Sequence, residues 1–248
     1  MIKVLINGIN GKMGQEVLSQ VNSNSNFTAL CGTDVEAGTI QNVKVYSNTE
    51  EILDKPDVII DFSIPKATLN ILEYANKNRI PTVIATTGFS NDDLEIIKDY
   101  SKSLPIFKSA NMSYEVNLMA DLVASLATKL KDSDIEIVDV HHNRKIDSPS
   151  GTALILADSI NNALDNTMDY EYNRHSKKEK RSKNEIGIHS IRGGTEVGKH
   201  TVYFFGDNES FEITHTVNSR SIFAKGALKA AEFIIDKPNG LYDMKDLI

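Results

Sequence analysis

The sequence has a single cysteine, no excess of basic residues and no long apolar run, and each absence excludes a class of protein. One cysteine, Cys31, cannot form an intramolecular disulfide, so a disulfide-stabilised framework is excluded. The 27 lysines and arginines are outnumbered by 34 aspartates and glutamates, and the net charge of -7 argues against a nucleic-acid-binding surface. No apolar run approaches the roughly 20 residues of a transmembrane helix. We therefore expect neither a nucleic-acid partner nor a membrane partner.

The first residues, MIKVLINGING, also lack the pattern of a secretory leader, because they enter a strand pattern directly. Together with the lone cysteine, this predicts a cytoplasmic protein. The chain of 248 residues is long enough for one large domain or two smaller ones. An apolar content of 40% and a charged content of 25% are ordinary for a globular protein, so disorder is not expected.

Short apolar runs alternate with helical periodicity over the first part of the chain, up to about residue 111. Several of these runs are apolar throughout, which is typical of strands covered on both faces. Strands alternating with helices at this spacing predict right-handed crossovers and a doubly wound parallel α/β sheet. The expected strands are residues 2–7, 27–34, 57–63 and 82–88, and the expected helices are residues 13–21 and 65–78.

The pattern changes in the remainder of the chain. Two alternating runs within residues 200–217, joined by Gly-Asp-Asn, predict an antiparallel hairpin and hence a second domain of the α+β class. Residues 172–194 form a long polar stretch, and its lysine-rich run at 177–183 is expected to be a solvated loop. The other expected elements are an amphipathic helix at 117–131, a strand at 134–142, a helix beginning near Pro149 and a helix at 222–235.

A glycine-rich turn lies between the first strand and the first helix. Gly8, Gly11 and Gly14 are spaced three residues apart, where side chains would block the approach of a dinucleotide pyrophosphate to free amides at a helix start. Such glycines alone are weak evidence, but Asp34 ends the second strand, where an acidic residue binds the ribose hydroxyls. We expect a Rossmann-type dinucleotide site here.

The residues around Asp34 also bear on the choice of coenzyme. Val35 follows it, so no arginine stands there to neutralise a 2′-phosphate, which the carboxylate would repel. NADH is therefore expected to be preferred over NADPH. Lys12, in the glycine turn, leaves NADPH open as an alternative because its ammonium group can approach a phosphate from another direction.

A second cluster combines cationic side chains with a helix start. Free amides, a hydroxyl, a lysine and imidazoles around one helix start form a receptor for a carboxylate or phosphate. The abundance of positive charge in an otherwise acidic chain favours a functional role over a structural one. The potentially cationic residues are His141, His142, Arg144 and Lys145, and the helix start comprises Pro149, Gly151 and Thr152.

Two other kinds of site are not supported near this cluster. Neither cysteine nor carboxylate falls at a zinc-ligand spacing beside the adjacent histidines, and adjacent strand residues point to opposite faces, so no metal site is expected. Ser150 lacks the G-x-S-x-G context of a serine nucleophile. The other histidines are scattered along the sequence, at His175, His189, His200 and His215.

The segment HHNRKIDSPSGTAL resembles the H-H-x-x-K-x-D-x-P-S-G-T-A motif of the 4-hydroxy-tetrahydrodipicolinate reductase family, also called dihydrodipicolinate reductase. The resemblance extends over essentially the whole chain, through GINGKMG, DFSIP, ATTGFS, KSANMS, RGGTEVGKHTVYF and EITHTVNSRSIFAKGA. It implies reduction of 4-hydroxy-tetrahydrodipicolinate with NADH or NADPH and loss of water, in lysine biosynthesis through diaminopimelate. It also implies a dinucleotide-binding domain of residues 1–112 and 220–248, an inserted substrate-binding domain of residues 113–219, and a homotetramer formed through the second domain.

The resemblance further implies roles for individual residues. His141 and Lys145 would be the catalytic proton donors, with their order of importance left open. His142, Lys145, Gly151 and Thr152 would bind the cyclic dicarboxylate substrate. The coenzyme would be bound by Gly8, Ile9, Asn10, Gly11, Lys12, Met13, Asp34, Ala85, Thr86, Thr87, Ser109, Ala110, Asn111 and Met112.

Two alternatives can be weighed against this prediction. Another two-domain nicotinamide enzyme, such as an aspartate dehydrogenase, would keep the glycine turn but would not need His-His-x-x-Lys before Ser-Gly-Thr. A redox sensor that binds NAD(H) and DNA needs a basic DNA-reading module, and the first expected strand begins at Ile2. The whole motif favours the reductase.

Overall fold

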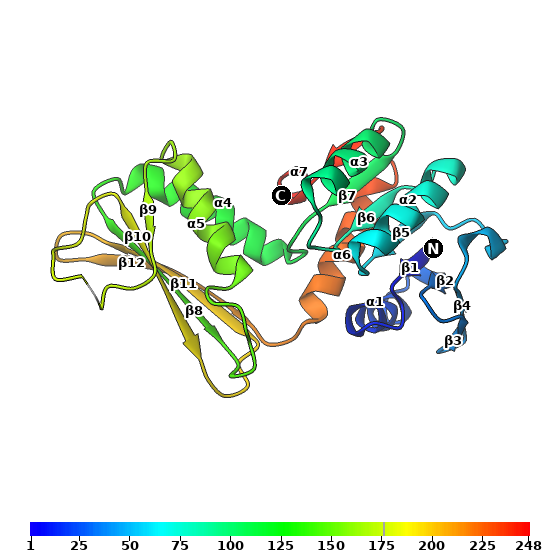
Figure 1. Cartoon of the computed structure of the whole chain (residues 1–248), viewed down its shortest axis with the longest axis horizontal. Helices are drawn as coiled ribbons and strands as arrows, with labels where there is room; N and C mark the ends of the chain where they lie inside the picture. Colours follow the sequence, from blue (N-terminus) through cyan, green and yellow to red (C-terminus); the bar gives the residue numbers. More distant parts are fainter. Residues whose placement is uncertain (176) are drawn as a thin grey trace. The chain divides into compact units, whose positions relative to one another are not determined.

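The computed structural model describes residues 1–175 and 177–248, which divide into two compact units (Figure 1). The first unit comprises Met1–Tyr114 and Ser221–Ile248, and the second comprises Glu115–Arg220. Within the described residues, no helix has both the length and the apolar content needed to cross a membrane. The assignment of the coenzyme to one domain and the substrate to the other stays a prediction.

An eight-stranded sheet forms the centre of the first unit, in the order β13-β7-β6-β5-β1-β2-β4-β3. All neighbouring strands are parallel except β3 and β4. The strands are β1 (Ile2–Asn7), β2 (Phe27–Thr33), β3 (Gly38–Ile40), β4 (Val43–Tyr46), β5 (Val58–Asp61), β6 (Thr82–Ile84), β7 (Pro105–Lys108) and β13 (Gly240–Tyr242). The helices are α1 (Lys12–Asn22), the short 3-10 helix η1 (Thr49–Glu51), α2 (Pro65–Asn78), α3 (Asn91–Ser101), α6 (Ser221–Ile234) and α7 (Met244–Leu247).

The strand order of this sheet confirms the predicted doubly wound topology. From β1 the chain proceeds outward to β2 and β4, and it then returns to place β5 on the other side of β1. The connections after β1 and β5 therefore leave in opposite directions, which creates a topological switch point between these two strands. In sheets of this kind, ligands bind in the crevice beyond the carboxyl ends of the strands at that point.

The apolar strands have both faces covered, as their sequences predicted. In β1, Val4 and Ile6 belong to the core under α1 and α6, whereas Leu5 belongs to the core under α2 and α3. β5 repeats this alternation, with Ile59 on the side of Leu5. Because side chains alternate along a strand, a strand covered on both faces is apolar at nearly every position, and this fixes the sheet at the centre of the unit.

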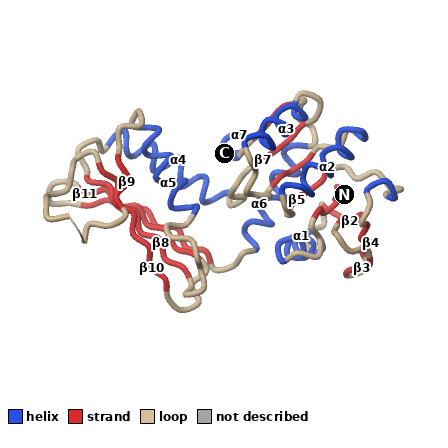
Figure 2. Tube along the Cα trace, viewed as in Figure 1, coloured by secondary structure: helices blue, strands red, loops and turns tan. Residues whose placement is uncertain are grey.

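The second unit has a five-stranded sheet in the order β12-β11-β8-β10-β9, with helices along one face (Figure 2). β10 runs parallel to β8 and β9, whereas β11 runs antiparallel to β8 and β12. Ile137 and Val202 pair across β8 and β11 and face the helices, so the residues next to them along each strand, such as Glu136 and Tyr203, face the other way. The elements are α4 (Tyr114–Lys129), β8 (Asp134–His141), α5 (Gly151–Ala163), β9 (Asp169–Glu171), β10 (Glu185–Arg192), β11 (Gly198–Phe205) and β12 (Ser210–Val217).

The predicted hairpin of β11 and β12 is confirmed, but the polar stretch of residues 172–194 contains a strand that was not predicted. This stretch includes β10, which lies beside β8 and supplies Ile186 and Ile188 to the core. β10 was not predicted because Ile186 and Ile188 are separated by Gly187 and flanked by polar residues, so that only one face has a short apolar pattern. The helix predicted to begin near Pro149 begins at Gly151, because the Ser150 side chain caps it by accepting the Ala153 amide.

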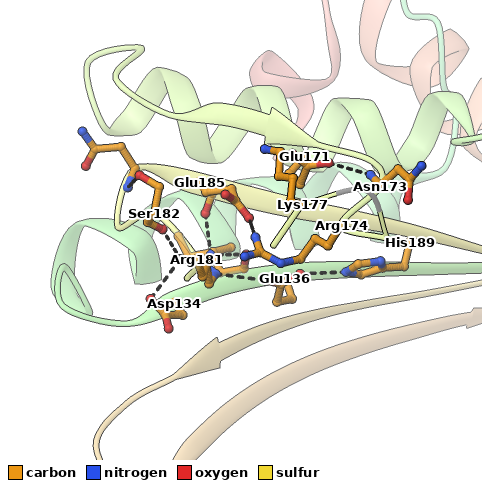
Figure 3. Close-up of polar contacts among 12 residues, drawn as sticks. Asp134, Glu136, Glu171, Asn173, Arg174, Lys177, Arg181, Ser182, Glu185 and His189 are labelled. Atoms are coloured by element: carbon orange, nitrogen blue, oxygen red, sulfur yellow. Dashed lines mark hydrogen bonds and ion pairs between the residues drawn. The ribbon is translucent and has the colours of Figure 1, made fainter. Parts of the chain in front are cut away.

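Charged side chains attach the lysine-rich segment to this sheet (Figure 3). The Arg181 guanidinium donates to Glu136 Oε1 at 3.0 Å, to Asp134 Oδ1 at 2.9 Å and to the Ile135 carbonyl at 2.9 Å. His189 Nε2 lies 2.8 Å from the other oxygen of Glu136. Arg174 pairs with Glu185 and Lys177 with Glu171. The lysine-rich segment is therefore only partly a solvated loop, since Arg181 bonds to β8 and, through the Glu185 carbonyl, to β10.

Candidate functional site

The glycine turn after β1 has little space for side chains. Gly8 has a φ of 80°, and a Cβ atom there would lie 2.5 Å from the Phe62 carbonyl oxygen. A Cβ atom at Gly14 would lie 2.1 Å from the Gly8 carbonyl oxygen. Gly11 precedes α1, and within the described part of the chain no side chain caps this helix start. The turn therefore brings bare backbone close to helix amides, as dinucleotide phosphates require.

Asp34 lies directly after β2 and is fixed beside the glycine turn. Its Oδ2 atom accepts the Asn10 amide at 2.9 Å, and its Oδ1 atom accepts the Val35 amide at 2.8 Å. The carboxylate consequently has a defined orientation at the carboxyl end of the sheet. This is where an acceptor for ribose hydroxyls is needed in the dinucleotide fold.

A pocket of about 440 Å³ lies at the switch point of the first sheet. It lies beyond the ends of β1, β2 and β5, the three strands that meet the glycine turn. The bare turn, the carboxylate and this volume together fit an adenine dinucleotide. The lining residues are Asn7, Gly8, Gly11, Thr33, Asp34, Val35, Ser47, Thr49, Phe62, Ser63, Ile64, Ala67, Asn70 and Ile71.

A buried carboxylate supports the inner wall of this pocket. Asp61 is fully buried at the end of β5 and accepts Asn7 Nδ2 at 2.7 Å, Thr68 Oγ1 at 2.6 Å and Thr86 Oγ1 at 2.8 Å, together with the Ser63 hydroxyl at 2.5 Å. Burial raises the pKa of the Asp61 carboxyl, while these four hydrogen bonds oppose the increase. The network joins the ends of β1, β5 and β6, and sequence analysis did not identify its centre.

The predicted coenzyme residues divide into three groups. Gly8, Gly11 and Asp34 line the pocket, and Asn10, Lys12 and Met13 adjoin it in the turn and the first turn of α1. Ile9 and Met112 have side chains in the core, so only their backbone could meet a ligand. The remainder follow β6 and β7 at the same edge of the sheet without lining the pocket, namely Ala85, Thr86, Thr87, Ser109, Ala110 and Asn111.

The second cluster lies at the end of β8 in the second unit. Backbone hydrogen bonds hold the turn after this strand: the His142 amide donates to the Glu196 carbonyl at 2.7 Å, and the Gly193 amide donates to the His141 carbonyl at 2.9 Å. The Lys145 ammonium pairs with Asp147 Oδ1 at 2.8 Å. A Cβ atom at Gly151 would meet none of the described atoms within 4 Å. The first amide of α5 is thus approachable.

Asp139 is the buried centre of this cluster. Its side chain is fully buried in β8 and lies between the guanidinium of Arg192, with which it forms an ion pair, and the Ser150 amide at 2.7 Å. Burial alone would raise the pKa of the Asp139 carboxyl, but the hydrogen bonds and the charge of Arg192 outweigh it, and the pKa is lowered. Asp139 is therefore ionised at neutral pH.

His141 and His200 pack against each other in this cluster. Their ring centroids are 5.1 Å apart with the planes at 71°. His141 Nδ1 lies 3.4 Å from Asp139 Oδ1, and His200 Nε2 lies 3.0 Å from Ser150 Oγ. Burial and the positive charge of Lys145 lower the pKa of His141, although Asp139 opposes this. Burial and the neighbouring His141 lower the pKa of His200 to about 4.

The structure corrects one expectation from the sequence and adds three residues to this cluster. His200 was expected to be scattered away from the His141–His142 pair, but strand pairing places it opposite Asp139 and against His141. Asp139, Arg192 and His200 were not predicted as site residues. Asp139 could have been found from the sequence, because it lies two positions before His141 in a predicted strand, and residues two apart in a strand share a face. Among the described residues, no group of three or more His, Cys, Asp or Glu side chains is arranged to bind a metal ion.

Comparisons with known proteins match both units. A family model for the N-terminus of dihydrodipicolinate reductase matches residues 2–112, and one for its C-terminus matches residues 115–248. A 4-hydroxy-tetrahydrodipicolinate reductase of Caldanaerobacter subterraneus subsp. tengcongensis is 47% identical over 100% of this chain and 98% of its own length. Its counterpart in Clostridium tetani is 43% identical, with coverage of 98% and 96%. A solved dipicolinate-bound dihydrodipicolinate reductase from Paenisporosarcina sp. TG-14 has 25% identity and a TM-score of 0.84, with 100% of both chains covered.

The low pKa of buried His200 predicts a loss of stability in acid. The unfolded chain binds a proton at this histidine near pH 6.5, but the folded chain binds it only near pH 4. The free energy of unfolding should therefore fall as the pH falls between these values, by on the order of 3 kcal/mol from this group. His200→Gln, which can keep the contact with Ser150 and cannot ionise, should make the profile flatter. Urea unfolding followed by circular dichroism from pH 4.5 to 8 measures this.

The exposed His175 supplies the control for that measurement. His175→Gln replaces an exposed histidine outside the cluster and should leave the pH profile unchanged. An equal slope for the wild type and His200→Gln would show that His200 does not remain neutral in the folded protein.

Proposed function

The chain belongs to the dihydrodipicolinate reductase family, and we propose from this premise how its residues carry out the reaction of that family. The enzyme is an oxidoreductase that reduces 4-hydroxy-tetrahydrodipicolinate to tetrahydrodipicolinate, with loss of water, in lysine biosynthesis. Hydride and one proton are added, and the hydroxyl leaves as water, so the overall reaction consumes one reduced coenzyme and one proton. The observation that carries this assignment is the match of both family models over nearly the whole chain.

The coenzyme is proposed to bind at the glycine turn of the first unit. When bound, NADH or NADPH supplies the hydride. The chain contributes bare amides at the start of α1 for the pyrophosphate, and Asp34 accepts hydroxyls of a ribose. The remaining contacts are assigned to the residues after β6 and β7, namely Ala85, Thr86, Thr87, Ser109, Ala110, Asn111 and Met112, the last through its backbone because its side chain is buried.

The substrate is proposed to bind at the cluster of the second unit. A dicarboxylate needs positive charge and amide donors, and the cluster has both in the Lys145 ammonium and the first amides of α5, at Gly151 and Thr152. His142 lies in the same turn, and its Nδ1 atom is buried with no hydrogen-bond partner among the described atoms. A bound carboxylate would give this nitrogen a partner.

Proton transfer is assigned to His141 and Lys145. Because the pKa of His141 is lowered, most of the imidazole is neutral at neutral pH, so it must take up a proton before it donates one. The Lys145 ammonium lies beside Asp147, with which it forms an ion pair. We therefore assign the first proton donation to Lys145 and proton exchange with the substrate or water to His141.

Lys145→Met removes the ammonium group but keeps most of the side-chain volume. Because the variant loses both a cation for the carboxylate and a proton donor, kcat/KM should fall by about 100-fold or more. The assay follows oxidation of the reduced nicotinamide, with substrate generated from pyruvate and aspartate semialdehyde by the preceding synthase. Lys178→Met, at an exposed position, is the matched control. Unchanged turnover in Lys145→Met would remove this lysine from the catalytic set.

We propose that NADH is preferred over NADPH, because the Asp34 carboxylate would repel a 2′-phosphate. Asp34→Ala should raise the KM for NADH by about 10-fold through loss of a charged hydrogen bond, and should leave the KM for NADPH unchanged or lower. Steady-state rates with both coenzymes measure the ratio. Glu36→Ala removes an exposed carboxylate two positions away and should change neither constant. If the two variants behave alike, ribose recognition lies elsewhere.

We also propose a cytoplasmic homotetramer that assembles through the open face of the second sheet. That face carries the stacked rings of Tyr203 and Phe205, with centroids 5.4 Å apart, and the half-exposed Ile191. Exposed apolar side chains on a regular strand surface favour contact with another copy. Light scattering should give four times the mass of the chain, and Phe205→Glu should give smaller species. A monomeric wild type would contradict the proposal.

A further inference from the structure

Asp139 has four polar partners, and they come from β8, from β10 and from the residue before α5. Its Oδ1 atom faces the Arg192 guanidinium and His141 Nδ1. Its Oδ2 atom accepts the Ser150 amide at 2.7 Å and the Ser190 hydroxyl at 3.2 Å. One carboxylate therefore touches the proposed proton-exchanging imidazole and the residue that caps α5.

We propose that Asp139 is a positioning residue that holds His141 with its proton on Nδ1 and its lone pair on Nε2, and that Arg192 keeps this carboxylate ionised. The proposal rests on the proposed function, because it gives His141 its role in proton exchange. An ionised carboxylate can only accept a hydrogen bond, so the ring nitrogen facing it must be an N–H group. The other nitrogen is then the one that exchanges protons.

A glycine leaves room beside the Nε2 atom of the imidazole. A Cβ atom at Gly198 would lie 3.2 Å from His141 Nε2, closer than side-chain carbons usually approach, so glycine keeps that side of the ring uncrowded. His200 packs its ring edge-on against His141 and bonds to Ser150 through its own Nε2. It therefore fills space without competing for the carboxylate.

The charge of Asp139 also sets the proton affinity of His141. The charged or titratable groups around this imidazole are Lys145 from the turn after β8, Arg192 from β10, His200 from β11 and, next to His200, His215 from β12. Burial and the two cations lower the pKa of His141, and Asp139 is the group that opposes them. Without the carboxylate, the imidazole would bind a proton still more weakly and would take one up less readily during turnover.

The second oxygen of Asp139 connects proton exchange to substrate binding. Ser150 is the residue before α5, and its amide is held by Asp139. The proposed carboxylate-binding amide of Gly151 follows directly in the chain. The same side chain thus fixes the imidazole and the start of the helix in one arrangement, which is what a reaction between a bound carboxylate and a positioned proton donor requires.

Asp139→Asn in the full chain tests the proposal, since asparagine has nearly the same shape but no charge. We expect kcat to fall by about 100-fold, the KM for the substrate to change much less, and the acidic limb of the kcat–pH profile to move to lower pH. Nitrogen-15 NMR of labelled histidines should report the Nδ1–H tautomer for His141 in the wild type and a mixture of tautomers in the variant. A residue with only a structural role would change neither the tautomer nor the pH profile.

Ser190→Ala is the matched control, because it removes a donor to Asp139 Oδ2 without touching His141; it should retain the tautomer and nearly all of the activity. An Nε2–H tautomer in the wild type would overturn the proposal, and this outcome needs no variant to fold. A normal tautomer and pH profile in Asp139→Asn would also overturn it. A wild type without reductase activity would instead refute the proposed function, while the tautomer would still test the geometry.

Discussion

A carboxylate removed from water must be surrounded by donors, and in each unit of this chain one such carboxylate gathers the segments that form a site. Asp61 ends β5 in the first unit and joins the ends of three strands at the wall of the pocket beside the glycine turn. Asp139 lies in β8 of the second unit and connects a histidine, an arginine and a helix start. Burying a carboxylate without hydrogen-bond partners costs free energy, so its donors cannot move independently of one another. The buried carboxylate therefore fixes the geometry of each site.

The two carboxylates differ in the charge of their partners. Asp61 accepts hydroxyl and amide groups only, and burial raises its pKa. The Asp139 side chain is as fully buried as that of Asp61. The Arg192 guanidinium lies against it, however, and the pKa of Asp139 is lowered. Neutral donors suit the wall of a pocket proposed for an anionic coenzyme. A cation in this wall would attract the phosphates away from the amides of the glycine turn. A guanidinium suits the other site, where a lasting negative charge is needed to orient an imidazole.

Local sequence patterns were sufficient to predict four strands of the first sheet, β1, β2, β5 and β6, and the two motif-bearing turns. The strands around Leu5 and Ile59 are apolar on both faces, and Gly8 and Gly14 lie where the chain has no room for a side chain. Strand β10 was missed because only one of its faces is apolar, and β13 because a three-residue strand at the edge of a sheet leaves almost no pattern. The partners of His141 were missed for a different reason. Arg192 and His200 are 51 and 59 residues further along the chain, and only the pairing of β10 and β11 with β8 brings them to Asp139.

The net charge of the chain also determines how the two proposed sites can attract their ligands. Both proposed ligands are anions, yet the protein has a charge of -7, so long-range attraction cannot draw them in. At physiological ionic strength, charges interact effectively over only about 8 Å, and the sites must therefore depend on donors in direct contact. Backbone amides at helix starts serve this purpose without adding a mobile side chain, and the few cations present lie close to carboxylates, as Lys145 does to Asp147. Arg192 has a second effect in this setting, because it offsets the negative charge that Asp139 would otherwise present to an incoming dicarboxylate. The positioning of the imidazole and the admission of the substrate thus depend on the same ion pair.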